Sequence, residues 1–449
     1  MRRSKYRTGR TPMASLVHVV AAVVTAAAVA VSVPETAAAA EPAGRQDDPV
    51  AGWARQHAEP LRTTEPSRPL DDLGPLRDAV GPARMVGLGE AVHGAAELVD
   101  LKHRALRLLV ERMGFRSVAW EEDWTTGVRI DTYIRTGQGD PDALAREMGP
   151  QWSSSRDVAD VLRWLRGFNA GRAAADQVRF VGVEFFMTRR PAYDAVADYV
   201  AGAAPERADE LGELLEELRP ETDDIWQHIS WYQGVKNKRP YVHRARQVHE
   251  LVATVPHPPG DRSHALALHN ARQIRSFYEF YALGEDEQST YRDARAAENL
   301  RWWHDRTGGR TAYWAASPHT ADAPGIRLTQ PDMSFASAGS YLRGWYGRDY
   351  RSIGFTLDHG TVATGDGRTA ELPPPDPGWF EQPLGQVRAD QFVLDLHRPA
   401  ATPPVRAWLH GPVLTRGPGP GSVASGGSLA QWFDAVVHRQ SVTPSQPLA

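Results

Sequence analysis

The chain has 449 residues, of which 41% are hydrophobic and 24% are charged, so it can bury a full core as one large domain or two ordinary ones. The formal net charge of −4 gives no electrostatic basis for binding nucleic acid or an anionic membrane surface. Because the sequence contains no cysteine, disulfides, thiolate metal sites and cysteine nucleophiles are excluded.

The N-terminal segment has the pattern of an export signal. A basic head of five Arg and Lys residues precedes an apolar run over 14–33, and small residues at 37–40 fit a cleavage site. We therefore predict a signal peptide over 1–40, a secreted protein, and no stable membrane insertion after cleavage. An uncleaved N-terminal membrane anchor is the alternative, because the apolar run is near spanning length. Residues 41–66 are predicted to be an N-terminal extension with one short helix.

Two apolar runs that end in polar turns come next. Residues 85–89 lead into a turn with Glu90 and His93, and residues 115–120 lead into Glu121. The segment between them repeats apolar residues at helical spacing, which indicates a strand–helix–strand unit. The strands of such a unit run parallel, so their carboxyl ends share one edge of the sheet, where open α/β sheets bind ligands. We predict that Glu90, His93 and Glu121 converge on an active site there.

Further strands are predicted over 178–183, 311–316, 350–357 and 391–396. The first of these ends at Glu184, and the second is followed closely by His319. Titratable side chains gathered at strand ends are a common way to build a site with shifted pKa values. Residues 415–428 are rich in Gly and Pro and are predicted to be a loop, and 429–437 a last helix.

Residues 190–305 have a different character, being charged, helical in period and poor in strand-like runs. The predicted fold is therefore α/β, with a mainly parallel sheet flanked by helices and an inserted α-helical bundle over 190–305. The two parts of the catalytic core would cover 67–189 and 306–449. Signatures of serine α/β-hydrolases, P-loop enzymes, dinucleotide-binding domains and zinc peptidases are absent from the sequence.

Taken together, these motifs resemble the erythromycin esterase family. A Gly-x-Gly-Glu-x-x-His-Gly turn is matched at 87–94, and a strand ending in Glu-x-Asp-Trp is matched at 121–124. A helix with an Arg and a Glu-Asn pair is matched at Arg292, Glu298 and Asn299. Three shorter motifs follow in order, at 395–398, 406–409 and 433–435.

The resemblance covers roughly residues 50–449 and implies an α/β core with a helical bundle. It also implies hydrolysis of a cyclic ester without a metal or a cofactor. In the family, the histidine matching His93 is taken as the general base, with carboxylates matching Glu90 and Glu121 around it. The expected partner is a small ester or lactone rather than nucleic acid, and the protein is expected to be a monomer.

The chain departs from the family pattern after the fourth predicted strand. Family members usually read Trp-Ala-His-Asn-x-His there, whereas this chain reads Trp-Ala-Ala-Ser-Pro-His over 314–319. Ala316 thus replaces the first histidine, and His319 is the second. Glu184 stands where the family has an Asp after the third strand.

The predicted catalytic residues are His93, Glu121 and Glu90. Substrate-binding or oxyanion-stabilising roles are predicted for His319, Lys102, Arg104 and Glu184, of which Lys102 and Arg104 match basic residues of the family's first helix. The structural alternatives are a capping role for His93, a turn held by backbone N–H bonds for Glu90, and a helix N-cap or an ion pair with Arg129 for Glu121. For Glu184 the alternative is an ion pair with Arg189 or Arg190, and for Lys102 and Arg104 it is a solvated helix face.

Three functions remain open from the sequence. The first is hydrolysis of a macrolactone or related ester, in which His93 activates water. The second is a biosynthetic reaction, elimination or lactone formation, in which the same histidine abstracts a proton from the substrate. The third is a degenerate family member that binds a ligand or a divalent metal through Glu90, His93, Glu121 and Glu184.

Overall fold

The computed structural model describes residues 48–152, 155–400 and 402–448. The predicted signal peptide lies outside these residues. The described chain contains one nine-stranded sheet, in which six strands are parallel neighbours in the order β13-β8-β2-β5-β3-β4. Their bounds are Met85–Glu90 for β2, Phe115–Asp123 for β3, Arg179–Glu184 for β4, Arg310–Ala316 for β5, Tyr350–Ala363 for β8 and Ala435–Val442 for β13.

The strands β2 and β3 are parallel, as the strand–helix–strand pattern predicts, but they are not adjacent. β5 pairs with both of them. The connecting helix is α3 (Ala96–Met113), and its apolar side is buried against the sheet. The carboxyl ends of β2, β3, β4 and β5 therefore lie along one edge, where the predicted site residues follow.

Antiparallel strands extend the sheet. β10 (Gln391–Asp395) pairs with β13, β1 (Glu59–Pro60) pairs with β10, and β9 (Thr369–Leu372) forms a hairpin with β8. A second, four-stranded antiparallel sheet, in the order β11-β12-β6-β7, is not hydrogen-bonded to the first but shares a hydrophobic cluster with β10 and β13. Its strands are Ile326–Thr329 for β6, Asp332–Phe335 for β7, Leu414–Arg416 for β11 and Val423–Ser425 for β12.

Two predictions for the C-terminal region are wrong. The segment 415–428 is not only a loop, because it contains most of β11 and all of β12. The predicted helix over 429–437 is reduced to α16 (Leu429–Trp432), and the chain then enters β13. β13 pairs with β8 on one side and with β10 on the other, so hydrogen bonding to two neighbours overrides the local helical pattern.

Helices cover both faces of the parallel strands. On one face, α3 packs with α2 (Gly74–Val80), α4 (Trp124–Thr136) and α6 (Arg156–Asn169). On the other face, α12 (Glu285–Thr307) and α14 (Ala338–Tyr346) pack against residues that alternate with those of the first face. This burial on both sides explains why the strands read as continuous apolar runs. The remaining helices outside the bundle are α1 (Pro49–His57), α5 (Pro141–Glu147), α13 (Ser317–Thr320) and α15 (Pro403–His410).

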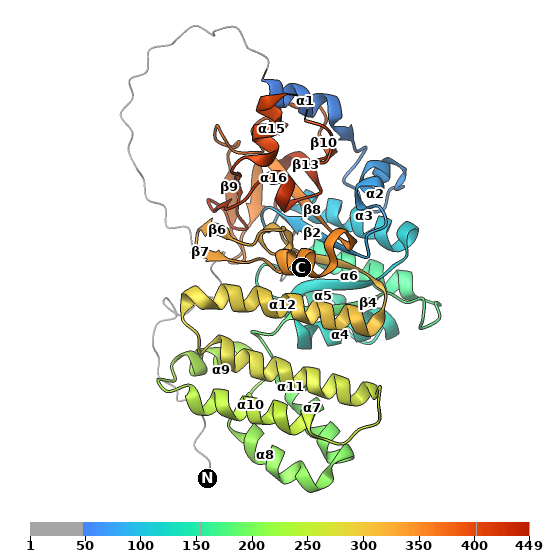
Figure 1. Ribbon diagram of the computed structural model, residues 1–449. Helices are drawn as coiled ribbons and strands as arrows, with labels where there is room; N and C mark the ends of the chain where they lie inside the picture. The colour runs from blue at the N-terminus through green and yellow to red at the C-terminus, as the bar shows by residue number, and fades with distance from the viewer. Residues whose placement is uncertain (1–47, 153–154, 401, 449) are drawn as a thin grey trace.

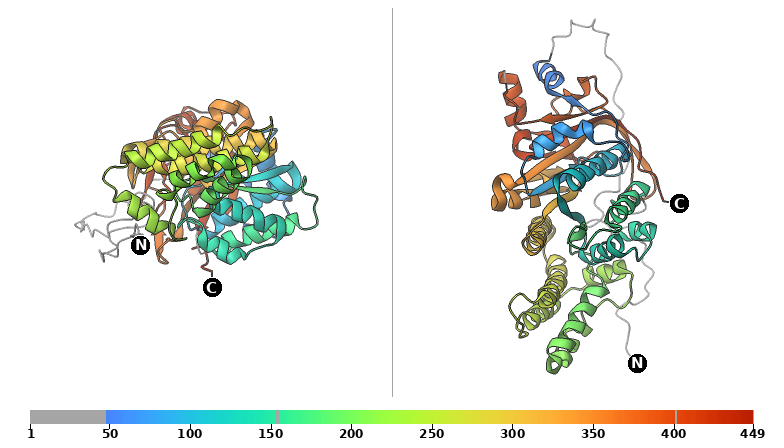
Figure 2. Two further views of the ribbon diagram at one scale, coloured as in Figure 1. Left: turned by 90° about the horizontal axis from the view of Figure 1, so that it is seen from below. Right: turned by 90° about the vertical axis from the view of Figure 1, so that its right-hand side faces the viewer.

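The helices between β4 and β5 project from the sheet as a separate layer (Figures 1 and 2). Five of them share a hydrophobic core, namely α7 (Arg190–Ala203), α8 (Ala208–Glu216), α9 (Ile225–Gln233), α10 (Arg239–Ala253) and α11 (Arg262–Phe280). α12 crosses between this bundle and the sheet, and its apolar residues pack on strand residues. The segment predicted as a bundle thus includes one helix that belongs to the packing of the α/β core.

The fold class is confirmed as α/β with a large, mainly parallel sheet. Across the described residues, no helix has the length and apolarity needed to span a bilayer. The apolar run over 14–33 falls outside them.

Candidate active site

The turn after β2 places two predicted catalytic residues in contact. Glu90 is the last residue of β2, and the Nδ1 atom of His93 lies 2.9 Å from its Oε1 atom. Lys102, in the second turn of α3, contacts the other carboxylate oxygen of Glu90 and donates a hydrogen bond to the Ala315 carbonyl at 3.2 Å. All three side chains are buried, so this group is shielded from bulk water.

His93 has the state that a general base needs. Burial lowers the pKa of His93 to about 4, although the negative charge of Glu121 opposes this, so the ring is neutral at neutral pH. A carboxylate can only accept a hydrogen bond, so Nδ1 carries the ring proton and Nε2 carries the lone pair. Among the described residues, no hydrogen-bond partner of Nε2 is found.

The Lys102 side chain lies among aromatic rings, which is an unusual environment for an ammonium group. Its Nζ atom lies 4.3 Å from the ring centroid of Trp314 and 5.6 Å from that of Trp152. Burial holds the pKa of Lys102 well below its ordinary value. The aromatic faces and the Glu90 carboxylate compensate the loss of hydration of the cation.

A second group forms around Arg292, which projects from α12. Its guanidinium donates to Glu121 at the end of β3, at 2.7 Å, and to Glu184 at the end of β4, at 2.9 Å. The other oxygen of Glu121 accepts the backbone N–H of Ala316 at 2.9 Å. One cation from the helical insertion therefore joins the carboxyl ends of two strands.

The two carboxylates on Arg292 differ in protonation. Burial raises the pKa of Glu121, but the positive charges of His319 and Arg292 outweigh it and bring the value to about 2. Burial raises the pKa of Glu184 to about 7, against the opposing charge of Arg292. Glu121 is thus a fixed negative charge, while Glu184 titrates near neutrality.

His319 belongs to this second group, and its pKa shifts in the opposite direction to that of His93. Its Nδ1 atom lies 2.9 Å from Asp293, and its Nε2 atom lies 3.4 Å from Glu121. Burial lowers the pKa of His319, but the charges of Asp293 and Glu121 outweigh it, so the net shift is upward. The site therefore combines a neutral imidazole with one that is readily protonated.

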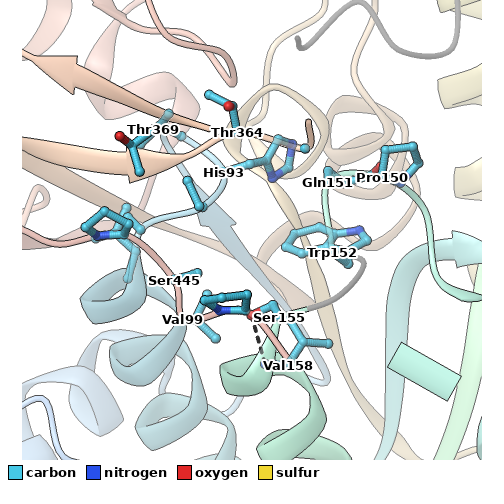
Figure 3. A pocket seen from close by; sticks show the side chains of 18 of the residues that line it. His93, Val99, Pro150, Gln151, Trp152, Ser155, Val158, Thr364, Thr369 and Ser445 are labelled. Carbon is cyan, nitrogen blue, oxygen red and sulfur yellow. Dashed lines mark hydrogen bonds between the residues drawn. The ribbon is translucent and has the colours of Figure 1, made fainter. Parts of the chain in front are cut away.

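A cavity of about 480 Å³ adjoins His93 (Figure 3). Its wall includes Trp152, whose ring meets the His93 ring edge-on at a centroid distance of 4.9 Å. The hairpin between β8 and β9 and the segment after β13 line other sides, as Figure 3 shows for Thr364, Thr369 and Ser445. The volume is in the range of small-molecule sites, which run from about 300 to 1,000 Å³.

With this geometry in place, similarity to known proteins decides the family. A family model described as "Erythromycin esterase" matches residues 110–442. The chain belongs to the erythromycin esterase family. The turn with Glu90 and His93 precedes the matched residues, so its assignment rests on the motif and on the structure.

Individual relatives of the erythromycin esterase type support this assignment. "Erythromycin esterase type II" from Escherichia coli is 31% identical over 132 residues, which are 29% of this chain and 30% of that protein. This match therefore spans about a third of that relative's length.

Solved structures match over nearly the whole described chain. A "succinoglycan biosynthesis protein" superposes with a TM-score of 0.76 at 26% identity and covers 89% of this chain and 98% of its own. A mutant of the erythromycin esterase EreC in its open conformation superposes with a TM-score of 0.68, covering 87% and 99%. Its identity is only 17%, so this second likeness is one of fold.

The structure brings six of the seven predicted site residues into these two groups. Arg104 is the exception, because its guanidinium pairs with Asp72 at 2.6 Å and donates to the Pro69 carbonyl at 2.7 Å. The alternative of a solvated helix face is wrong for both Lys102 and Arg104, since both side chains are fully buried.

The suggested ion-pair partners are also wrong. Glu121 and Glu184 share Arg292, whereas Arg129 contacts Glu147 and Arg190 pairs with Asp223. The family motif includes Arg292 but does not indicate its role in the site, and the sequence does not identify Asp293 as a site residue. The only available signal for Asp293 was its position next to Arg292 in that motif.

The described residues contain no group of three or more His, Asp or Glu side chains arranged to hold a metal ion. The four side chains considered as ligands are divided between two groups. Glu90 is bound to Lys102, and Glu121 and Glu184 are bound to Arg292.

Proposed function

We propose that this protein hydrolyses a macrolactone or a related carboxylic ester, with His93 as the general base. The observation that carries the proposal is the state of His93. The ring is neutral, Glu90 holds its Nδ1–H, and Nε2 is left without a described protein partner beside a cavity. Membership of the erythromycin esterase family supports ester hydrolysis as the reaction class.

The chemistry balances without a metal. His93 Nε2 accepts a proton from water while the water oxygen forms a bond to the ester carbonyl carbon, and the carbonyl π electrons move to its oxygen. When the carbonyl re-forms, the bond to the alcohol oxygen breaks, and the leaving alkoxide takes the proton from the His93 imidazolium. A lactone thereby becomes a hydroxy acid. Glu90 orients the ring and stabilises the imidazolium, as a carboxylate does in other histidine-based sites.

Arg292, together with His319 when its ring is protonated, supplies the positive charge that the tetrahedral oxyanion needs. Both contact Glu121, whose negative charge acts on His93. The Arg292 side chain keeps 22% of its surface exposed, so it is the more accessible of the two. Oxyanion donors of this kind contribute about 10²- to 10³-fold to turnover.

Ala316 sets this chain apart from the family pattern. Its methyl group is fully buried, and its contact with the site is the hydrogen bond that its backbone N–H donates to Glu121. We propose that Arg292 and His319 provide charge stabilisation without the imidazole that family members carry at this position.

A direct test compares His93→Gln with His359→Gln. His359 is a matched control because it also pairs with a carboxylate, Asp358 at 2.8 Å, but on the exposed surface. With erythromycin as substrate, the wild type and the control should give a ring-opened acid heavier by one water. His93→Gln should lose about 10²- to 10⁴-fold in turnover while keeping its melting temperature. Equal turnover of all three proteins would contradict the proposal.

A second candidate function is favoured by one observation. The "succinoglycan biosynthesis protein" has this fold at 26% identity, and its name describes synthesis rather than breakdown. In this alternative, His93 would take a proton from the substrate itself, for elimination or lactone formation. The product would then be formed without addition of water, which the mass measurement distinguishes.

A further inference from the structure

The segment that follows β13, Thr443–Pro447, runs across the amino ends of two helices, and we call it the C-terminal strap. The Ala96 N–H of α3 donates to the Thr443 carbonyl at 2.9 Å, and the Arg156 N–H of α6 donates to the Gln446 carbonyl at 2.8 Å. Two isolated β-bridges, one before each helix, add to this attachment. The family match ends at Val442, so the strap lies beyond the part of the chain that the family model describes.

Two side chains at the starts of these helices anchor the strap, Glu97 of α3 and Arg156 of α6. Glu97 accepts the Thr443 N–H at 2.7 Å and the Thr443 hydroxyl at 2.9 Å. The Arg156 guanidinium donates to the Gln446 side-chain oxygen at 3.3 Å. The strap therefore has a defined position, fixed by side chains as well as by backbone.

The strap is attached directly beside His93. The Gly94 carbonyl accepts one hydrogen bond from the Ser445 N–H and one from the Ala363 N–H, each at 2.9 Å. Gly94 has a φ of +79°, and a Cβ there would lie 2.0 Å from the Ala363 carbonyl oxygen, so only glycine permits this approach. One residue thus connects the turn that carries His93 to two walls of the cavity, the strap and the β8–β9 hairpin.

The lining of the cavity between these walls is mainly uncharged. Its charged lining residues are already paired, Glu90 with His93 and Lys102, and Arg368 with Asp366. The rest of the lining is formed by apolar residues, several prolines and a few neutral polar side chains, including Leu98, Val99, Trp152, Val158, Thr369 and Ser445. Such a lining offers contacts to an apolar ring and to hydroxyl groups, but no free partner for a charged acyl group.

We infer that the C-terminal strap forms the specificity wall of the substrate pocket and selects esters with a large, mainly apolar ring, such as macrolactones. This inference rests on the proposed function, because it places the substrate of that reaction in the cavity beside His93. It assigns the selection of substrate size to five residues outside the matched family region.

The test fills the pocket from the strap with Ser445→Trp. Leu448→Trp is the matched control, because Leu448 follows the strap but does not line the cavity. Erythromycin and p-nitrophenyl acetate serve as a large and a small ester. In Ser445→Trp, the ratio of kcat/KM for erythromycin to that for p-nitrophenyl acetate should fall at least about tenfold, mainly through KM. The control should keep the wild-type ratio, and an unchanged ratio in folded Ser445→Trp overturns the inference.

Glu97→Ala provides a variant that leaves the pocket unfilled but removes two anchors of the strap. Glu111→Ala, at the exposed far end of the same helix, is its control. Calorimetric titration of erythromycin into wild type, Ser445→Trp and Glu97→Ala separates binding from turnover. Weaker binding in both variants supports the role of the strap in substrate selection, even if the wild type fails to hydrolyse erythromycin. That failure would contradict only the proposed function. Equal binding to all three, or no binding to the wild type, overturns the inference.

Discussion

At the scale of single residues, the pKa values of the two site histidines shift in opposite directions. His93 is buried with one carboxylate, and burial dominates, so the pKa of His93 falls to about 4. His319 is buried between Asp293 and Glu121, and their combined charge outweighs burial, so the pKa of His319 rises. A neutral ring can accept a proton and a protonated ring can stabilise an anion, so the two histidines suit different steps of the proposed hydrolysis.

The opposite pKa shifts of His93 and His319 predict the pH dependence of kcat/KM. Activity should rise with pH through the pKa of His93, about 4, and fall as pH increases through the raised pKa of His319. Asp293→Asn removes a negative charge from His319, so the pKa of His319 falls and the alkaline limb should move to lower pH. Asp305→Asn, at an exposed position of the same helix, should leave both limbs in place. An alkaline limb that stays fixed in Asp293→Asn would show that His319 does not control it.

The planar guanidinium of Arg292 gives a second prediction at this scale. It reaches Glu121 and Glu184 at once, which a single ammonium group cannot reproduce with the same geometry. Arg292→Lys should lower kcat by about 10²- to 10³-fold. Arg295→Lys, one turn further along α12 and paired with Glu298, should have no such effect. Steady-state kinetics on folded proteins checks this, and equal kcat values would remove Arg292 from the mechanism.

The sequence predicts the strand-end residues of the site but not the residues that α12 contributes. Glu90, His93 and Glu121 follow from the parallel-strand rule, which needs only local patterns. Arg292 meets Glu121 across 171 positions of sequence, and no local pattern specifies which surface of an inserted helix turns toward the sheet. The same limit explains why the sequence suggests nearby arginines as the ion-pair partners of Glu121 and Glu184.

At the scale of elements, α3 carries two buried basic residues that have different roles. Lys102 turns toward Glu90 and the site, whereas Arg104 binds the segment before α2 through Asp72 and the Pro69 carbonyl. Two residues apart on a helix lie on different faces, so this division follows from helix geometry.

Breaking the Arg104–Asp72 pair should therefore affect stability rather than activity. Arg104→Met leaves a buried carboxylate without its cation and should cost about 3–5 kcal/mol of unfolding free energy. Burial raises the pKa of Asp72, but the hydrogen bonds from Arg104 and from the Arg62 backbone outweigh it, so the net shift is downward. The contribution of the pair is thus present at neutral pH and is lost as pH falls through the lowered pKa of Asp72.

Urea denaturation at neutral and acidic pH measures this loss. Arg112→Met, on the exposed face of the same helix, is the control and should change stability by less than about 0.5 kcal/mol. A pH-independent effect of Arg104→Met, or one no larger than that of Arg112→Met, would contradict the assigned role. KM for the ester should be the same in both variants.

The element that the sequence misassigns most clearly is β13. Its residues read Ala-Val-Val-His-Arg-Gln-Ser-Val, a short apolar run followed by polar residues, and such a run does not distinguish a strand from a helix. The polar half is stabilised as a strand by partners far away in the sequence. His438 pairs with Thr356 of β8 and with Phe392 of β10. Propensity alone carries no information about such partners.

At the scale of the whole molecule, the α/β core and the inserted helices form one functional unit. The core supplies Glu90, His93 and Glu121 at one edge of the sheet, and α12 brings Arg292 and Asp293 to the same edge. The strap beyond the matched family residues then closes one side of the cavity. Export through residues 1–40, the secreted location and the monomeric state remain predictions from the sequence.

The central claim is that the reaction adds water to an ester under the control of His93. The most direct measurement incubates erythromycin with the protein in ¹⁸O-labelled water and analyses the ring-opened product by mass spectrometry. The account predicts one ¹⁸O atom in the new carboxylate with the wild type and with His359→Gln, and almost none with His93→Gln. Ring opening without incorporated ¹⁸O, or equal incorporation by His93→Gln, would contradict it.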